Sequence, residues 1–196
     1  MDKSDAATMF QKADFNISLE HSKSAVSGNL SKVAITGIDA ATGRTGVAIF
    51  DNQGIDKPII VSPKFLEEHT MFGASIALSY DGRILMVGDP VKINDETTKC
   101  PGSYGGVYTF VYDAATHTYH QSQRIRPPDG YIYNGKADVA VTGDFGTLIK
   151  AERVMMKDVL IIFSADGCMH EYRHVKLKDG EYSHRWQFVK SVYPWE

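Results

Sequence analysis

The chain has 196 residues and a formal net charge of −3 at pH 7, with 43% hydrophobic and 11% aromatic residues. This length is enough for one domain with a sizeable core, or for two small ones. The only two cysteines, Cys100 and Cys168, exclude a disulfide framework. Acids and bases are interspersed, so no basic field indicates duplex nucleic acid, although binding of a single strand does not require one.

The N-terminal segment MDKSDAATMFQKAD has no apolar signal-peptide core, and no apolar run in the chain approaches the thickness of a bilayer. We therefore expect a cytoplasmic protein, or a virion component made in the cytoplasm. Residues 1–14 form an N-terminal arm. Within it, Asp5–Ala13 has a cap residue followed by good helix formers. This pattern predicts either a short helix that packs over a partner or a frayed terminus.

From residue 15 onward the hydrophobic pattern predicts three copies of a four-strand unit. The first and weakest copy spans residues 15–63. Its expected strands are Phe15–Leu19, Val33–Gly37, Thr45–Asp51 and Pro58–Pro63, with a turn at Asn52-Gln53-Gly54. Proline closes this unit, as it closes the two that follow.

The second copy spans residues 72–128. Asp81-Gly82 predicts a tight turn between its first two strands, because this pair tolerates the positive φ that such turns need. The apolar run from Ile84 to Val87 shows no alternation, which indicates burial on both faces. The expected strands are Ala74–Tyr80, Arg83–Gly88, Gly105–Tyr112 and Tyr119–Ile125.

The third copy spans residues 145–194 and repeats the Phe-Gly opening at Phe145-Gly146. Its expected strands are Thr147–Glu152, Asp158–Ser164, Cys168–Val175 and Trp186–Val192. The alternative is an ordinary antiparallel sandwich whose strands merely look alike. The repeated Phe-Gly opening, the matching order of loops and the proline endings favour repeated units.

The middle copy, FGASIALSYDGRILMVGDP followed by GGVYTF, resembles the FG-GAP repeat of integrin α-chain β-propellers. In that repeat Phe-Gly opens the first strand, an apolar run ending in Val-Gly-Ala-Pro forms the second, and Gly-x-Val-Tyr-x-Phe forms the third. Here Asp89 replaces the alanine. The third copy keeps Phe145-Gly146 but lacks the Val-Gly-x-Pro, and the first keeps only the hydrophobic plan. The resemblance implies an all-β propeller with three four-stranded blades in the chain.

Members of that family often bind calcium through an Asp-x-Asp-x-Asp-Gly loop between the first two strands. The corresponding turns here are Ser79-Tyr80-Asp81-Gly82 and Val154-Met155-Met156-Lys157. Neither turn offers three carboxylates at alternating positions, as a calcium cage needs. We therefore expect no metal and no cofactor.

Propellers close with four to eight blades, so three blades leave two open sides. A second copy related by a two-fold axis would complete a six-bladed ring, and two-fold dimers are the commonest oligomers. The start at Met1 and the end just after the last expected strand favour a complete chain over a fragment. The sequence therefore predicts a homodimer.

The two longest stretches without expected strands are Val91–Tyr104 and Pro127–Asp144. Alternating strand direction would bring both to the same face of a propeller, and long loops of this kind usually carry function. Their tyrosines are candidate anchors with charged and polar neighbours. The candidate partner-binding residues are Lys99, Tyr104, Arg126, Asp129, Tyr131, Tyr133, Asn134 and Lys136. We expect this long-loop face to bind another protein.

Catalytic patterns are weak. The sequence has no Gly-x-Ser-x-Gly elbow, Walker loop or His-Glu-x-x-His motif. His170 and His174 share an expected strand, where they lie about 13 Å apart, too far to ligate one metal. His117 and His120 flank a turn with no obvious third ligand, and Cys168 has no implied histidine–acid pair. We therefore expect no enzyme, with an active site in the central channel kept as an alternative.

A carbohydrate-binding propeller is the other alternative, because propeller lectins stack sugars on tryptophan between blades. Arg185 and Trp186 would form such a site, but the other two units lack a matching tryptophan. A core role for Trp186 and an interface role for Trp195 are favoured. The sequence thus predicts a non-catalytic binding or scaffolding propeller, suited to a multi-subunit or viral assembly. Nucleic acid is the least favoured partner, and no membrane association is expected.

Overall fold

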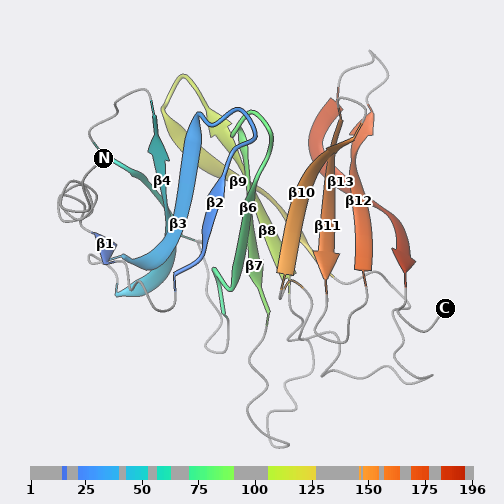
Figure 1. Cartoon of the computed structure of the whole chain (residues 1–196), viewed down its shortest axis with the longest axis horizontal. Coiled ribbons are helices and arrows are strands. Elements are labelled where there is room, and N and C mark those ends of the chain that lie inside the picture. The colour runs from blue at the N-terminus through green and yellow to red at the C-terminus, as the bar shows by residue number, and fades with distance from the viewer. Residues whose placement is uncertain are drawn as a thin grey trace, which may run out of the picture.

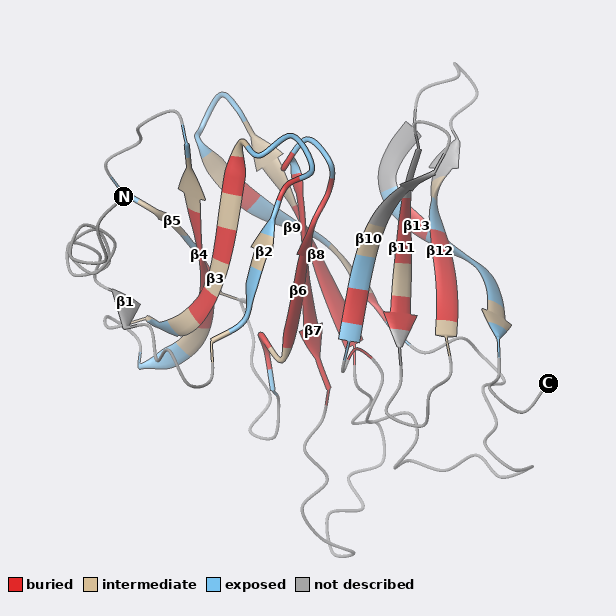
Figure 2. Cartoon of the chain, viewed as in Figure 1, coloured by how far each residue is buried: buried red, intermediate tan, exposed pale blue. Residues whose placement is uncertain are grey.

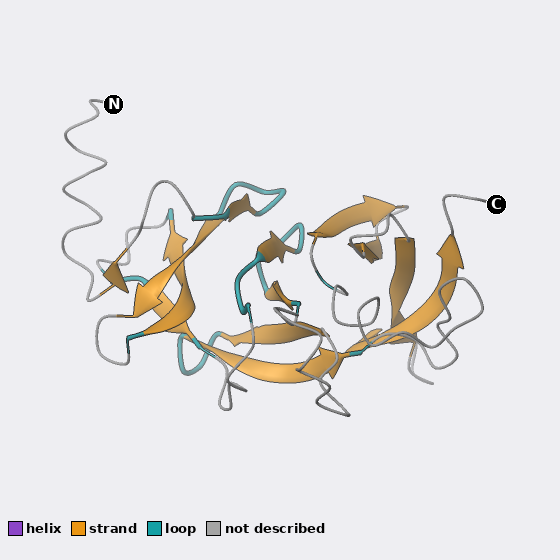
Figure 3. Cartoon of the chain, turned by 90° about the horizontal axis from the view of Figure 1, so that it is seen from below, coloured by secondary structure: helices purple, strands orange, loops and turns teal. Residues whose placement is uncertain are grey.

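The computed structural model describes residues 15–16, 22–39, 43–52, 57–62, 71–90, 106–126, 146, 148–154, 157–163, 169–176 and 182–192. These residues form thirteen strands, and no described residue is helical (Figure 3). Within this part of the chain no helix is long and apolar enough to cross a membrane. The N-terminal arm, with the expected helix at Asp5–Ala13, lies outside the described residues.

The strands form three antiparallel sheets that follow one another along the chain and along the long axis of the molecule (Figure 1). Sheet 1 contains β1 (Phe15–Asn16), β2 (Ser24–Val26), β3 (Lys32–Asp39), β4 (Arg44–Asp51) and β5 (Ile59–Val61). Sheet 2 contains β6 (Ser75–Leu78), β7 (Ile84–Asp89), β8 (Gly106–Asp113) and β9 (Thr118–Ile125). Sheet 3 contains β10 (Leu148–Val154), β11 (Lys157–Phe163), β12 (Met169–Lys176) and β13 (Tyr182–Val192). For the described residues, the predicted all-β chain with three successive antiparallel sheets is confirmed, and sheets 2 and 3 have the four strands predicted.

Sheet 1 departs from the prediction at its first strand. Both β1 and β2 pair with β3, at opposite ends of the same edge, so the sheet is four strands wide although it has five strands. The expected strand Phe15–Leu19 corresponds to β1, which ends at Asn16 among the described residues. The strand β2 was not predicted; it pairs with β3 as β6 pairs with β7.

Two buried apolar clusters hold the three sheets together. The first joins sheet 1 to one face of sheet 2 and includes Ile49, Leu85 and Phe110. The second joins the other face of sheet 2 to sheet 3 and includes Met86, Leu160 and Trp186. Sheet 2 is therefore covered on both faces, and β6 and β7 are buried along their whole length (Figure 2). Lack of alternation in Ile84–Val87 is thus explained, because both faces of that strand are core.

The Phe-Gly openings mark the joints between sheets. Gly73 and Gly146 have φ values of 91° and 92°, a region that favours glycine. A Cβ on Gly73 would lie 3.2 Å from Thr36 Cγ2 in sheet 1. Gly146 meets sheet 2 in the same way, since Ser75 Oγ donates to its carbonyl oxygen at 2.8 Å. The same turn therefore brings each later sheet close to the one before it.

The two ends of the sheets differ in what connects their strands. We call one end of the sheets the loop end. At this end the last residue of β7 pairs with the first residue of β8. The last residue of β9, Ile125, lies at the same end, because it pairs with Val107. The connections 91–105 and 127–145 leave from these strand ends. At the other end, here called the turn end, short turns join β2 to β3, β6 to β7 and β8 to β9.

Candidate functional site

Most predicted partner-binding residues lie outside the described part of the chain. Lys99, Tyr104, Asp129, Tyr131, Tyr133, Asn134 and Lys136 belong to this group. Arg126 is described: it is exposed, follows the last residue of β9 at the loop end, and its carbonyl oxygen accepts a hydrogen bond from Tyr172 Oη at 3.3 Å. The strand ends that flank both long stretches lie at this same end.

Trp186, the predicted alternative sugar-binding residue, is only 4% exposed and packs in the cluster between sheets 2 and 3. Its ring lies 4.0 Å from the ring of His174, measured between centroids. Its backbone is held by Gln123 of sheet 2, which accepts from Trp186 N at 2.9 Å and donates to Trp186 O at 3.2 Å. Arg185, beside it, is exposed. The burial of Trp186 matches the core role favoured for it, and Trp195 lies outside the described residues.

The histidines whose side chains the structure describes do not gather into a site. His170 and His174 both lie on β12, as predicted, and His170 is fully buried with its Nδ1 2.9 Å from Ser191 Oγ. His117 lies in the turn between β8 and β9 and His120 lies near the start of β9, and both are exposed. No group of three or more histidine, cysteine or acidic side chains in the described residues could hold a metal ion. Cys100 and Cys168 lie outside those residues.

Two turns at the turn end have the same construction. Ser27 Oγ donates to Asn29 Oδ1 at 2.9 Å and accepts from Lys32 N at 2.9 Å. In the next sheet, Ser79 Oγ donates to Asp81 Oδ1 at 2.7 Å and accepts from Ile84 N at 2.9 Å. We call these the Ser-x-Asx turns. They confirm the predicted turn at Asp81-Gly82, but the aspartate acts through its carboxylate and only the glycine has positive φ.

The two Ser-x-Asx turns also contact each other. Asn29 N donates to the carbonyl oxygen of Tyr80 at 2.9 Å. The Tyr80 ring covers Gly28 so closely that a Cβ there would lie 2.4 Å from a ring carbon. The turns therefore join sheet 1 to sheet 2 at the turn end, while the Phe-Gly openings lie on the loop-end side of the joints.

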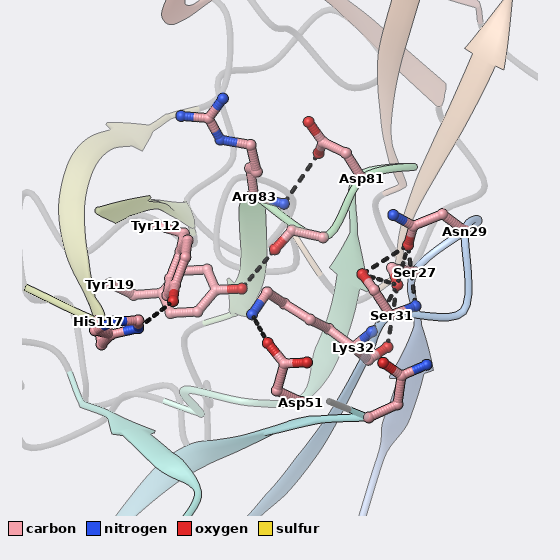
Figure 4. Close-up of polar contacts among 12 residues, drawn as sticks. Ser27, Asn29, Ser31, Lys32, Asp51, Asp81, Arg83, Tyr112, His117 and Tyr119 are labelled. Atoms are coloured by element: carbon pink, nitrogen blue, oxygen red, sulfur yellow. Dashed lines mark hydrogen bonds and ion pairs between the residues drawn. The ribbon is translucent and has the colours of Figure 1, made fainter. Parts of the chain in front are cut away.

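A polar cluster lies just inside these turns (Figure 4). Lys32 Nζ forms an ion pair with Asp51 Oδ2 at 2.8 Å, with side-chain exposures of 6% and 15%. The same Nζ lies 4.2 Å from the centroid of the Tyr112 ring, which belongs to sheet 2. Tyr112 Oη in turn lies 2.9 Å from His117 Nδ1. A cation held between a carboxylate and an aromatic face suits a joint between sheets.

Two groups beside this cluster have shifted pKa values. Burial, reinforced by the nearby Tyr112, raises the pKa of the Tyr119 hydroxyl, which donates to the carbonyl oxygen of Gly82. Hydrogen bonds from Ala115 N and the Thr116 hydroxyl lower the pKa of the exposed Asp113 carboxyl. The first shift keeps a phenol neutral at the joint, and the second stabilises the charged carboxylate in the turn between β8 and β9.

The chemistry of the cluster is structural. Lys32 directs its ammonium at Asp51, and Tyr119 directs its hydroxyl at a backbone carbonyl of the neighbouring turn. These donors therefore face acceptors within the protein. Lys32, Asp51 and Tyr119 were not among the site residues predicted from the sequence. The signal that could have found them is the repeated Ser-x-Asx spacing, Ser27–Asn29 and Ser79–Asp81, each ahead of a buried strand.

The face of sheet 1 that is turned away from sheet 2 is apolar; we call it the outer face of sheet 1. Cross-strand pairing puts its residues on one side: Val26 opposite Val33, Val33 opposite Phe50, and Ala48 opposite Ile35 and Ile60. Val26 is 53% exposed and Ile60 is 38% exposed. Between these two edges Val33, Ile35 and Phe50 are half-buried and Ala48 is buried.

The chain matches no family model and no curated protein. Among solved structures, a structural-genomics target from Lactobacillus plantarum is similar over 87% of this chain and 41% of that chain, at 16% sequence identity and a TM-score of 0.33. The chain thus spans less than half the length of that protein. At this TM-score the likeness carries no argument about fold or function.

Proposed function

We propose that the chain is half of a six-bladed propeller that acts as a non-catalytic binding scaffold for another protein. In this proposal sheets 1, 2 and 3 are blades of the FG-GAP kind, and a second copy closes the ring. Such a scaffold would work in the cytoplasm, or in a virion assembled there. The loop end is the face that recognises the partner.

One observation carries the proposal: successive sheets meet through the same joint, and an apolar face remains at the start of the series. Gly73 rests on Thr36 of sheet 1, and Gly146 rests on Gly88 and Ser75 of sheet 2. A stack built by repetition favours a further sheet beside sheet 1, because exposed apolar side chains such as Val26 and Ile60 cost free energy in water. Closing the series into a ring is how propellers remove such open sides.

The polar groups of the described residues support binding over catalysis. The most buried ion pair, Lys32–Asp51, lies in a joint between sheets and contacts the Tyr112 ring. Trp186 is packed against His174 and held by Gln123. These groups stabilise the stack, and this leaves the long connections at the loop end as the segments available for recognition.

The partner face would comprise Arg126 and the residues predicted around it in the two long connections. Tyrosine and arginine are favoured in binding hot spots because each offers a large contact area and a polar tip. The residues proposed to contact the partner are Lys99, Tyr104, Arg126, Asp129, Tyr131, Tyr133, Asn134 and Lys136.

Affinity capture with matched variants tests this function. The wild-type chain, the loop-end variant Arg126→Ser/Tyr131→Ser/Tyr133→Ser and the turn-end control His120→Ser would each be used as bait in an extract of the source cells. His120 is exposed, at the end opposite the long connections. We expect a protein that the wild type and the control retain and the loop-end variant loses. Identical captures with all three baits, or loss with the control alone, would contradict the proposal.

A further inference from the structure

Resting on the proposed function, we propose that the outer face of sheet 1 docks head to tail on the outer face of sheet 3 in a second copy of this chain. The outer face of sheet 3 is the side turned away from sheet 2. These two outer faces would be the surfaces at which the proposed ring closes.

The outer face of sheet 1 is built like a packing face. The two Ser-x-Asx turns show which positions of β3 and β7 are equivalent, because each turn is followed by the first residue of its strand. By this comparison Val33 is equivalent to Leu85, and Ile35 is equivalent to Val87. The cross-strand partners then match as well, since Phe50 lies opposite Val33 and Phe110 lies opposite Leu85.

In sheet 2 the residues at these positions pack against sheet 1. Leu85, Val87 and Phe110 all belong to the first apolar cluster. In sheet 1 the same positions carry Val33, Ile35 and Phe50, which are half-buried. The outer face of sheet 1 therefore repeats the surface with which one sheet of this protein packs on the sheet before it.

The surface that would receive it is the outer face of sheet 3. Leu148 is 56% exposed and Val192 is 40% exposed, at the two ends of one row that runs through Met169. Ile161 lies further along the same face, because it pairs with Lys150 and with Glu171.

This receiving face also carries charge. Glu171 pairs with Arg173 at 2.6 Å and with Lys190 at 3.6 Å. Lys150 lies in the same row, opposite Ile161. Among the described side chains of this face, these three cations outnumber the one carboxylate.

Head-to-tail docking is the arrangement that continues the contacts inside the chain. In both internal joints, the face of a later sheet packs on the opposite face of an earlier one. Sheet 1 of one copy on sheet 3 of another repeats that relation. Because each copy has one face of each kind, two copies related by a two-fold axis satisfy both.

Four variants test the surfaces. Variant A carries Val26→Lys/Ile60→Lys on sheet 1, and variant B carries Leu148→Lys/Val192→Lys on sheet 3. All four positions are at least partly exposed, so the changes remove little internal packing. Leu30→Lys is the control, since Leu30 is 68% exposed in a Ser-x-Asx turn. Val26→Glu/Ile60→Glu tests charge, because cations outnumber the carboxylate among the described side chains of the receiving face.

Solution mass and dissociation constants give the readout. We expect variants A and B each to weaken self-association at least tenfold and to rescue one another in part when mixed, because sheet 3 of A and sheet 1 of B then form one intact joint. The Glu variant should weaken association less than variant A, and the control should match the wild type. Loss of the dimer in A but not in B indicates docking of sheet 1 on sheet 1, and unchanged dimers in both indicate another surface. Either result overturns this inference and leaves the dimer standing.

A monomeric wild type would overturn the proposed ring and this inference with it, which separates the two failures. Cross-linking covers the case in which a variant does not fold. In a mixture of isotopically light and heavy wild-type chains, head-to-tail docking predicts links between Lys150 of one copy and Lys23 of the other. Both lysines are exposed. Lys150 lies on the edge strand β10, and Lys23 directly precedes the edge strand β2. Mixed-isotope links that join only sheet 1 to sheet 1 would contradict the arrangement.

Discussion

Leu30 in the first Ser-x-Asx turn occupies the position equivalent to that of Gly82 in the second turn. Their φ values are 60° and 70°, and each backbone N–H donates to the carbonyl oxygen of the serine of its turn. A leucine in this left-handed region is strained, whereas a glycine is not. The two turns therefore have the same local structure, with a strained residue in the first turn and an unstrained glycine in the second.

We predict that Leu30→Gly stabilises the protein by about 0.5–1 kcal/mol, because relief of strain exceeds the added entropy of the unfolded chain. Urea unfolding measures this as a higher midpoint with an unchanged slope. Gly82→Ala should destabilise by more than Gly43→Ala. Both glycines have positive φ, but a Cβ on Gly82 would lie 2.9 Å from Lys32 Cδ, while a Cβ on Gly43 meets nothing within 4 Å. A lower midpoint for Leu30→Gly would contradict the equivalence of the turns.

The Lys32–Asp51 pair gives a second prediction at this scale. Lys32→Met should cost about 3 kcal/mol of unfolding free energy, because it leaves a mostly buried carboxylate without its cation. Replacing both residues, as Lys32→Met/Asp51→Leu, should recover most of that loss. Urea unfolding of the two single variants and the double variant completes the cycle. A double variant no more stable than Lys32→Met would show that Asp51 is not the residue that needs the lysine.

Among the elements, β9 and β13 are linked by one side chain. Gln123 accepts from Trp186 N and donates to Trp186 O, so it acts as a clamp between sheets 2 and 3. We predict that Gln123→Ala costs about 2 kcal/mol, from the loss of two hydrogen bonds at a partly buried site. The amide of Trp186 should also exchange with solvent faster.

Gln121→Ala is the matched control, on the same strand but exposed, and should change stability by less than about 0.5 kcal/mol. Equal losses from Gln121→Ala and Gln123→Ala would mean that the clamp does not hold the sheets together.

At the same scale, strand existence and order were predictable from the sequence because both depend on apolar runs and turn residues. The runs at Ile84–Val87 and Val159–Phe163 gave β7 and β11 within a residue or two. The strand β2 was missed because Ser24–Val26 has one apolar residue on each face and is only three residues long. Its Ser27–Asn29 turn contains Leu30 where a glycine is expected, which hid its match to the turn at Asp81-Gly82.

The joints between sheets were harder to predict. Lys32, Tyr112 and Gln123 belong to different strands, and their contacts depend on how sheets pack rather than on local pattern. Charged and polar residues on strands are usually solvated, so sequence alone does not select the buried ones. The predicted binding residues lie mostly in connections outside the described residues, so those predictions stay predictions.

For the molecule as a whole, both interfaces between sheets contain a buried tyrosine. Tyr119 is 8% exposed in the first apolar cluster and Tyr172 is 3% exposed in the second. Burial raises the pKa of both hydroxyls above the usual 10.0. Each therefore stays neutral in the folded state under conditions in which the unfolded chain ionises.

The unfolded state then binds fewer protons than the folded state, so stability is full below pH 10 and falls as pH rises above it. We predict a loss of about 1.4 kcal/mol per pH unit for each tyrosine. Urea unfolding at several pH values between about 8 and 11 measures the slope. Tyr119→Phe should remove about half of it. A slope that Tyr119→Phe does not change would show that this phenol does not drive alkaline unfolding.

The association of the whole chain depends on its open faces. Val26 and Ile60 on the outer face of sheet 1, and Leu148 and Val192 on the outer face of sheet 3, are exposed apolar side chains. If the sheets are half of a ring, two chains should stay together at low micromolar concentration, because each copy covers both open faces of the other.

The solution mass of the wild-type chain, measured by light scattering on a sizing column, decides whether two chains form a ring or each chain stays alone. We predict twice the mass of one chain, unchanged on dilution through the micromolar range. A stable species with the mass of one chain would contradict the ring, and would mean that the three sheets are not blades of a closed propeller.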